Sequence, residues 1–197
     1  MAIVGISPQH IYGKFKSGIA LDLHTLHSTP VGQNEYGHTQ FETIRPAIAE
    51  LLYQLKYKGD RSAAISIIDT TVDYMRPHRD KFDVIIPVPS SKVREIQPVS
   101  LLADGIGAAL GIPVISCVST TRATTELKGV TDPDRRKELL DGLYVVDGKL
   151  TRDKRVLLFD DLFRSGSTMN AITDALLGEG AACSVHALTI TRARSNQ

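Results

Sequence analysis

The stretch RVLLFDDLFRSGSTMNAI, residues 155–172, joins an apolar run to two adjacent carboxylates and then to a turn of small hydroxylated residues. The apolar run 155–159 has the continuous hydrophobicity of a strand that is buried on both faces, as in a parallel sheet. Residues 168–177 have the apolar spacing of a helix. We therefore expect Asp160 and Asp161 at the carboxyl end of a parallel strand, where sheets of this kind place their working residues.

Strand and helix patterns alternate along the rest of the chain. Helical spacing and stop signals predict helices over 43–59, 61–75 and 98–110. Continuous apolar runs predict strands over 82–88, 112–118, 143–146 and 183–190. The alternation predicts an α/β fold with a mostly parallel central sheet and helices on both faces.

Length and composition favour one globular domain. A chain of 197 residues with 42% hydrophobic residues can bury one sizeable core. We expect this domain over 41–197, with 1–40 as an irregular N-terminal flap or extension. The 23 Lys and Arg residues nearly balance 22 Asp and Glu residues, so neither nucleic acid nor an anionic membrane is indicated as a partner.

The cysteines and the N-terminal residues indicate a cytoplasmic protein. Cys117 and Cys183 lie in apolar segments, which favours reduced thiols that fill core space over a disulfide. The N-terminal residues lack the charged start and the apolar stretch of a signal peptide. No apolar run has the length that a membrane span needs.

The turn after the two acids has the features of a phosphate site. The small side chains of residues 164–168 allow backbone N–H groups to converge on an anion at a helix N-terminus, and the serine and threonine hydroxyls add donors. Carboxylates repel phosphate, so the two preceding acids are suited to the vicinal hydroxyls of a sugar or to a metal ion. A ribose 5-phosphate meets both requirements.

A structural interpretation stays open beside this one, in which the two acids cap the turn and SGST, residues 165–168, is an ordinary loop. No GxxxxGK[ST] and no GxGxxG occurs in the chain, which excludes the Walker A and dinucleotide-binding motifs. The order of strand, acids, small-residue turn and helix favours the ligand site over the ordinary loop.

The sequence resembles a known family at these positions. FDDLFRSGST, residues 159–168, resembles the motif that binds phosphoribosyl pyrophosphate (PRPP) in type I phosphoribosyltransferases. DVIIPVPSSK at 83–92 is similar to the pyrophosphate loop of these enzymes, and with LKYKGDR at 55–61 it indicates the ComF/GntX-like branch, over residues 41–192. The resemblance implies the type I phosphoribosyltransferase fold, with a flexible hood loop over residues 119–138.

The resemblance also implies a role for each matching residue. The ribose 2- and 3-hydroxyls would be held by Asp160 and Asp161, which with Lys92 form the expected catalytic set. The expected ligands of the 5-phosphate are Arg164, Ser165, Gly166, Ser167 and Thr168. The expected ligands of pyrophosphate are Ser90, Ser91, Lys92, Arg122 and Lys128. Mg²⁺ would arrive chelated by PRPP rather than in a protein cage, and the two acids are the side chains that could also reach it.

Some features depart from the branch or have an open role. Branch members commonly begin with a four-cysteine zinc module, and this chain has no cysteine before Cys117. Arg164 stands where nucleobase-salvage members often carry an acid that serves as a base, which argues against purine salvage by that route. The role of Lys56 and Tyr57, a recurrent pair of the branch, is open. Three histidines are expected on the surface rather than at a metal: His24, His27 and His38.

Two functions of different kinds follow from the resemblance. The first is an enzyme that transfers ribose 5-phosphate from PRPP to a nitrogen nucleophile and releases pyrophosphate. The second is a noncatalytic sensor or accessory protein of the same fold that binds PRPP or a nucleotide, linked to DNA uptake or defence. A doubly wound domain that binds another phosphate ester is a third interpretation. The acceptor is open, as is the choice between a homodimer and another protein partner.

Overall fold

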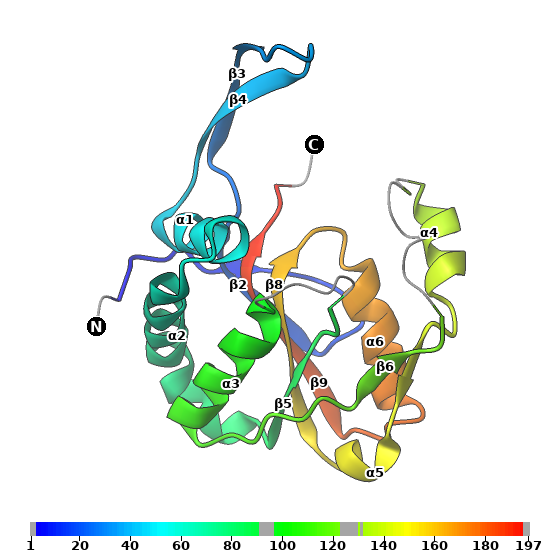
Figure 1. The fold of residues 1–197 in the computed structure, drawn as a ribbon. Coiled ribbons are helices and arrows are strands. Elements are labelled where there is room, and N and C mark those ends of the chain that lie inside the picture. Colours follow the sequence, from blue (N-terminus) through cyan, green and yellow to red (C-terminus); the bar gives the residue numbers. More distant parts are fainter. Residues whose placement is uncertain (1–2, 91–96, 123–129, 131, 195–197) are drawn as a thin grey trace.

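The structure is a computed structural model that describes residues 3–90, 97–122, 130 and 132–194. Its centre is a five-stranded sheet in the order β1-β2-β9-β8-β5 (Figure 1). The strands are β1 (Gln9–His10), β2 (Ser17–Leu23), β5 (Val84–Pro87), β8 (Arg155–Phe163) and β9 (Ser184–Arg192). All neighbouring pairs are parallel except β1 with β2, so the predicted mostly parallel sheet is confirmed.

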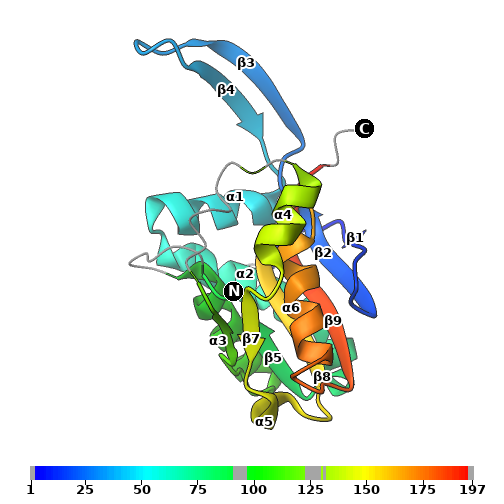
Figure 2. The same ribbon diagram turned by 90° about the vertical axis from the view of Figure 1, so that its right-hand side faces the viewer.

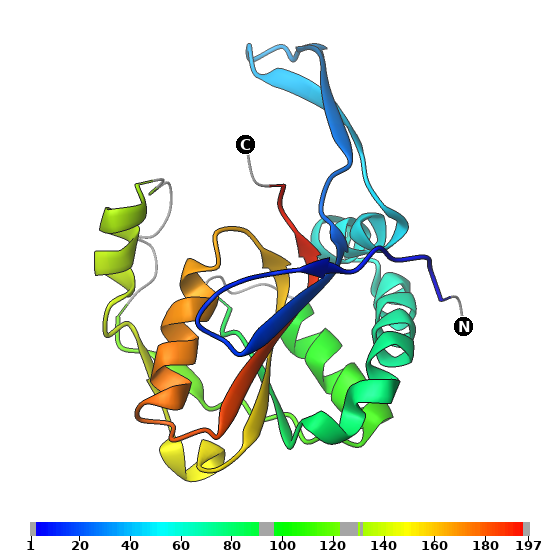
Figure 3. The same cartoon turned by 180° about the vertical axis from the view of Figure 1, so that it is seen from behind.

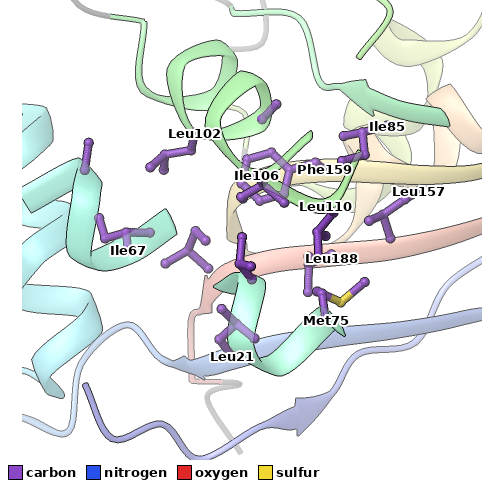
Figure 4. Packing of buried hydrophobic residues seen from close by; sticks show 14 of the residues in the cluster. Leu21, Ile67, Met75, Ile85, Leu102, Ile106, Leu110, Leu157, Phe159 and Leu188 are labelled. Carbon is purple, nitrogen blue, oxygen red and sulfur yellow. The ribbon is translucent and has the colours of Figure 1, made fainter. Parts of the chain in front are cut away.

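Helices cover both faces of this sheet, as predicted (Figures 1 and 2). One face carries α1 (Ala47–Tyr53), α2 (Arg61–Met75) and α3 (Pro98–Leu110), and the other carries α6 (Ser167–Leu177). Side chains alternate along β8, so each face has its own core. Leu157 and Phe159 pack with α1, α2 and α3 (Figure 4), whereas Val156 and Leu158 pack with α6.

Local capping explains why α2 and α3 have the predicted bounds. The Asp60 carboxylate accepts a hydrogen bond from the Ser62 N–H at 2.9 Å, which caps the start of α2. Pro98 occupies the first turn of α3, where it sacrifices no intrahelical hydrogen bond. Gly111 ends α3 in the left-handed conformation, with φ of 65°. These signals are local, so the sequence alone is sufficient to locate them.

The helix predicted over 43–59 is shorter and has two parts. Its first residues belong instead to strand β4 (Thr39–Ile44), and Pro46 has an extended ψ of 157°, so α1 begins only at residue 47. After α1 the chain continues as a π-helical turn, η1 (Gln54–Lys58), that ends at Gly59 with φ of 68°. A 3₁₀ turn, η2 (Arg76–Lys81), follows α2.

The N-terminal residues divide between the sheet and a projecting hairpin. Strands β1 and β2 extend the central sheet, whereas β3 (His27–Gln33) and β4 pair with each other and project away from the body (Figure 3). Every residue of β3 is exposed. The division of the chain at residue 40 stays a prediction. Strand β2, which precedes this position, belongs to the central sheet, and the hairpin of β3 and β4 spans it.

The region between α3 and β8 differs from the prediction. The strand predicted over 112–118 forms one parallel bridge, from Val114 to Ile85. The strand predicted over 143–146 lies outside the central sheet, because β7 (Tyr144–Val146) pairs antiparallel with β6 (Val118–Thr120). A short helix, α5 (Gly148–Thr151), leads into β8.

Part of the predicted hood loop is a helix. The loop was expected over 119–138, yet α4 (Pro133–Leu140) forms within it. The Asp132 carboxylate accepts a hydrogen bond from the Arg135 N–H at 2.7 Å, and Arg135 pairs with Glu138 one turn later. These polar contacts stabilise a helix that has no apolar stripe. The helix was not predicted because an apolar stripe is the pattern by which a helix is recognised in a sequence. Residues 123–129 and 131 of the loop lie outside the described residues.

The structure also tests two predictions, that both cysteines are buried and that no segment spans a membrane. Both cysteines are free, but only Cys117 is buried, so the prediction of a core position is wrong for Cys183. In the part of the chain that the structure describes, no helix has both the length and the apolar character needed to cross a membrane.

Candidate functional site

A cavity of about 110 Å³ lies where β8 ends and α6 begins. It brings together Asp160 and every residue of the predicted phosphate turn. It is also bordered by Arg136 of α4, one of the basic residues of the predicted hood loop. The lining residues are Arg136, Asp160, Leu162, Phe163, Arg164, Ser165, Gly166, Ser167, Thr168 and Met169.

The turn is held in shape by Gly166. This residue has φ of 75°, a left-handed conformation that L side chains rarely adopt, and it forms the N-cap of α6. A Cβ at this position would lie 2.7 Å from the Phe163 ring, so the backbone can approach the ring only without a side chain. The Ser165 and Ser167 hydroxyls lie 2.9 Å apart and hydrogen-bond each other. Glycine is therefore required for both the conformation and the packing.

The two acids face opposite sides of the sheet. Strand alternation directs Asp160 toward α6 and the cavity, and Asp161 toward the helices on the other face. The Asp160 carboxylate nevertheless reaches back to accept a hydrogen bond from the Asp161 N–H at 2.8 Å. Their joint role toward ribose hydroxyls stays a prediction, and the structure gives the two carboxylates different surroundings.

The pKa of Asp160 is raised to about 8. Burial is the main cause, and the negative charge of Asp161 is the second. The hydrogen bond from the Asp161 N–H and the charge of Lys56 act in the opposite direction but are weaker. At neutral pH the Asp160 carboxyl is therefore largely protonated, and it can donate a hydrogen bond as well as accept one.

Lys56 supplies the cation that Asp161 faces. Its Nζ lies 2.8 Å from the Asp161 carboxylate, and the two side chains are 12% and 13% exposed. Lys56 belongs to η1, and π-helical turns are frequent at functional sites because they redirect side chains within a helix. The neighbouring Tyr57 is exposed and packs against Tyr53, with the rings tilted by 37° and their centroids 5.1 Å apart. Lys56 thus contacts a residue of the predicted site, whereas the role of Tyr57 stays open.

His24 lies beside the same ion pair. Its Nδ1 is 3.1 Å from the Thr191 hydroxyl, which donates a hydrogen bond to the Asp161 carbonyl at 3.2 Å. Burial lowers the pKa of His24, with smaller contributions from nearby cations, the largest of them Lys56. The prediction of a surface position is wrong for His24, which is half-buried, and is confirmed for His27 and His38.

Tyr144 of β7 contacts Thr168 of the predicted phosphate turn. Thr168 hydrogen-bonds its hydroxyl group, and burial raises the pKa of that group. Sequence reasoning missed this residue because LYVV carries only the pattern of a strand, with no sign of which neighbour the strand would find.

The predicted pyrophosphate residues are only partly described. Ser90 is exposed, three residues after β5. Arg122 Nη2 donates to the Leu139 and Asp141 carbonyls at 3.0 Å each, which ties this side chain to the end of α4. Ser91, Lys92 and Lys128 lie outside the described residues. Their predicted role is therefore neither supported nor contradicted.

No group of three or more His, Cys, Asp or Glu side chains is placed to hold a metal ion in the described part of the chain. Of the two acids, only Asp160 lines the cavity, and the Asp161 carboxylate is paired with Lys56. This donor set fits an ion that keeps most of its ligands from a phosphate ester and water.

Comparison with protein families shows that residues 63–197 match the phosphoribosyl transferase domain. This chain belongs to the phosphoribosyltransferase family. A crystal structure of an adenine phosphoribosyltransferase superposes with a TM-score of 0.50 at 14% identity, over 85% of each chain. That likeness concerns the fold alone, and it agrees with the type I phosphoribosyltransferase fold that the resemblance implied.

Two curated relatives of this phosphoribosyltransferase-family chain are competence proteins. Competence protein ComFC of Bacillus subtilis is 25% identical over 155 residues, which cover 76% of this chain and 62% of the relative. Competence protein F of Haemophilus influenzae is 29% identical over 147 residues, 71% of this chain and 64% of the relative. The chain thus spans less than two thirds of either relative. The predicted similarity to the ComF branch is confirmed as a distant one.

Proposed function

We propose that this protein is an enzyme that binds PRPP with Mg²⁺ and transfers ribose 5-phosphate to a nitrogen nucleophile, with release of pyrophosphate. The observation that carries the proposal is the shared cavity of Asp160 and the turn 164–168 at the start of α6. A phosphate group and a sugar hydroxyl of one ligand can be bound there together.

The 5-phosphate is assigned to the turn 164–168. The first backbone N–H groups of α6 have no intrahelical acceptor, and the helix dipole favours an anion at this end. Arg164 and Arg136 add positive charge on two sides of the cavity. The Ser165 and Ser167 hydroxyls, which now hydrogen-bond each other, can turn to the phosphate oxygens.

The ribose hydroxyls are assigned to the two acids. The ion pair with Lys56 fixes the orientation of the Asp161 carboxylate, so that it can accept from a hydroxyl group. Magnesium chelated by the pyrophosphate oxygens of PRPP would spread the charge of the leaving group. Ser90, Ser91, Lys92, Arg122 and Lys128 remain the proposed ligands of pyrophosphate, on the family resemblance alone.

In this reaction the protein holds the ribose, the pyrophosphate and the acceptor in place and forms no covalent intermediate. Displacement at the anomeric carbon develops positive charge on the ribose and negative charge on pyrophosphate. The Asp161 carboxylate near the ribose and cations near the phosphates stabilise these charges, and fixed positions of donor and acceptor remove much of the entropic cost.

A noncatalytic PRPP-binding protein is the second candidate. Two observations favour it: both curated relatives are named as competence proteins, and Arg164 occupies a turn position where a carboxylate base would serve nucleobase chemistry. Such a protein needs the phosphate turn and the acids but no acceptor site, so the two candidates differ in turnover and agree in binding.

Calorimetry with PRPP and Mg²⁺, followed by an assay of pyrophosphate release, separates these possibilities. Replacing both acids, Asp160→Asn with Asp161→Asn, should weaken PRPP binding at least tenfold, since it removes both carboxyl groups that are proposed to bind the ribose hydroxyls. Asp73→Asn, which changes an exposed carboxylate on α2, is the matched control and should bind as the wild type does. Unchanged affinity in the double variant would refute the ribose assignment. Tight binding without pyrophosphate release from any acceptor would favour the second candidate.

A further inference from the structure

We propose that His24 is the general base of the transfer, and that its Nε2 accepts the proton that the acceptor nitrogen loses as the nitrogen bonds to the ribose. This inference rests on the proposed function and specifies the acceptor class. The predicted phosphate turn offers no side chain that could serve as a base. The turn position where a carboxylate could act as base holds Arg164, and a guanidinium cannot accept a proton at neutral pH.

His24 is placed at the working end of the sheet. It directly follows β2, whose carboxyl end lies beside those of β9 and β8, and its backbone N–H donates to the Arg192 carbonyl at 2.7 Å. Through Thr191 it is hydrogen-bonded to the Asp161 backbone. The His24 ring is therefore tied to the strand end that carries Asp161, and the charge of the Asp161 carboxylate acts on it.

The hydrogen bonds determine which ring nitrogen carries the proton. The Thr191 hydroxyl has one hydrogen, which it donates to the Asp161 carbonyl, so toward His24 it can only accept. Nδ1 is then the protonated nitrogen, and in the neutral ring Nε2 holds the lone pair. Within the described residues, Nε2 has no hydrogen-bond partner, so the lone pair is available to a ligand.

Burial and the nearby cations together keep His24 neutral until a substrate arrives. Burial is the main cause of its lowered pKa, and three cations add to it: Lys56 from η1, Arg45 ahead of α1 and Arg164 from the turn after β8. Asp161 acts in the opposite direction. PRPP is an anion with several charges, so its binding offsets these cations and raises the proton affinity of His24. The base becomes stronger when both reactants are present.

The proton balance of the step is complete. The lone pair of the acceptor nitrogen forms the bond to the anomeric carbon, and the carbon–oxygen bond breaks with its electron pair on pyrophosphate. The electrons of the N–H bond stay on nitrogen while its proton moves to Nε2. The imidazolium that results lies near the Asp161 carboxylate and returns its proton to water. A base of this kind suits acceptors with an N–H group to lose, such as pyrimidines, purines and aryl amines, and it gives no advantage with pyridine carboxylates.

The first test uses Mg²⁺, PRPP and named acceptors: uracil, orotate, adenine, hypoxanthine and anthranilate on one side, nicotinate and quinolinate on the other. His24→Asn keeps an amide N–H close to the position of Nδ1, so it can still donate to Thr191, but it removes the base. We expect it to lower kcat about 100-fold or more with an N–H acceptor, with PRPP affinity within twofold. His38→Asn, on the exposed hairpin, should match the wild type.

The pH profile separates a base from a structural residue. Wild-type kcat/KM should fall below an apparent pKa lower than about 6.5, where His24 becomes charged. His24→Asn should lose this acid limb. Nitrogen-15 NMR of the free protein at pH 7.5 should show Nδ1 protonated and Nε2 bare.

Each contrary result has a definite meaning. An active wild type whose His24→Asn variant keeps its rate refutes the base and leaves the proposed function intact. Turnover confined to nicotinate or quinolinate does the same, because those acceptors lose no proton. An Nε2–H tautomer refutes the inference without any assay of activity. A wild type that releases no pyrophosphate with any acceptor overturns both the proposed function and this inference.

Discussion

The ion pair between Lys56 and Asp161 leads to a prediction with a magnitude. At a separation of 2.8 Å the gross attraction is about 6 kcal/mol at an effective dielectric constant of about 20. Desolvation removes much of this, because the side chains are only 12% and 13% exposed. We expect a net coupling free energy of about 1–3 kcal/mol in a double-mutant cycle of Lys56→Met and Asp161→Asn.

Lys56→Met alone should be the more harmful change. It leaves the Asp161 carboxylate mostly buried without its cation, and a loss of about 2–4 kcal/mol in the free energy of unfolding is expected. It should also raise the pKa of Asp160 further, since the charge of Lys56 lowers it. Adding Asp161→Asn should recover part of the lost stability, because the uncompensated charge is removed.

Urea unfolding followed by far-ultraviolet circular dichroism provides the measurement, since the chain has no tryptophan. The pair of Lys14 and Asp174 is the matched control, with side chains 56% and 53% exposed. Its coupling should stay below about 1 kcal/mol and decrease further in 0.5 M salt. If the Lys56–Asp161 cycle gives a coupling no larger than that of the control pair, the reasoning from burial is wrong.

Two further predictions concern the cavity. Asp160 is mainly protonated in the folded protein up to about pH 8, whereas its unfolded-state pKa is about 3.9. The folded state therefore binds more protons between these values, so its contribution to stability falls as pH rises through this window. Asp160→Asn should remove at least about 1 kcal/mol of that fall between pH 5 and pH 8, and parallel pH profiles of urea midpoints would contradict this. Gly166→Ala should cost about 2 kcal/mol or more in stability, because of its φ of 75° and the Phe163 ring, and should weaken PRPP binding. Gly37→Ala, with the same φ but open space around it, is the control, and equal losses at both positions would show that packing against Phe163 plays no part.

The region around α4 shows where hydrophobic periodicity fails to predict the structure of this chain. Apolar spacing predicted α2 and α3 with their bounds, because capping residues such as Asp60 and Gly111 act on their immediate neighbours. The same approach missed α4, which is stabilised by Asp132 and by the pair of Arg135 and Glu138 rather than by an apolar stripe. It also placed residues 143–146 in the central sheet, since a strand pattern does not specify its partner.

The sequence by itself determined the α/β class, the small-residue turn before α6 and the membership of the family. These depend on short segments, such as a buried strand, two acids and a turn that requires glycine, in which each residue acts on near neighbours. Only the tertiary structure decided that the two acids face different sides of the sheet, and that Lys56 pairs with one of them. His24 and Thr191 are separated by 167 positions in the chain, yet their side chains hydrogen-bond. Contacts over such a separation arise because packing brings the carboxyl ends of β2, β9 and β8 together, and local sequence patterns carry no record of that packing.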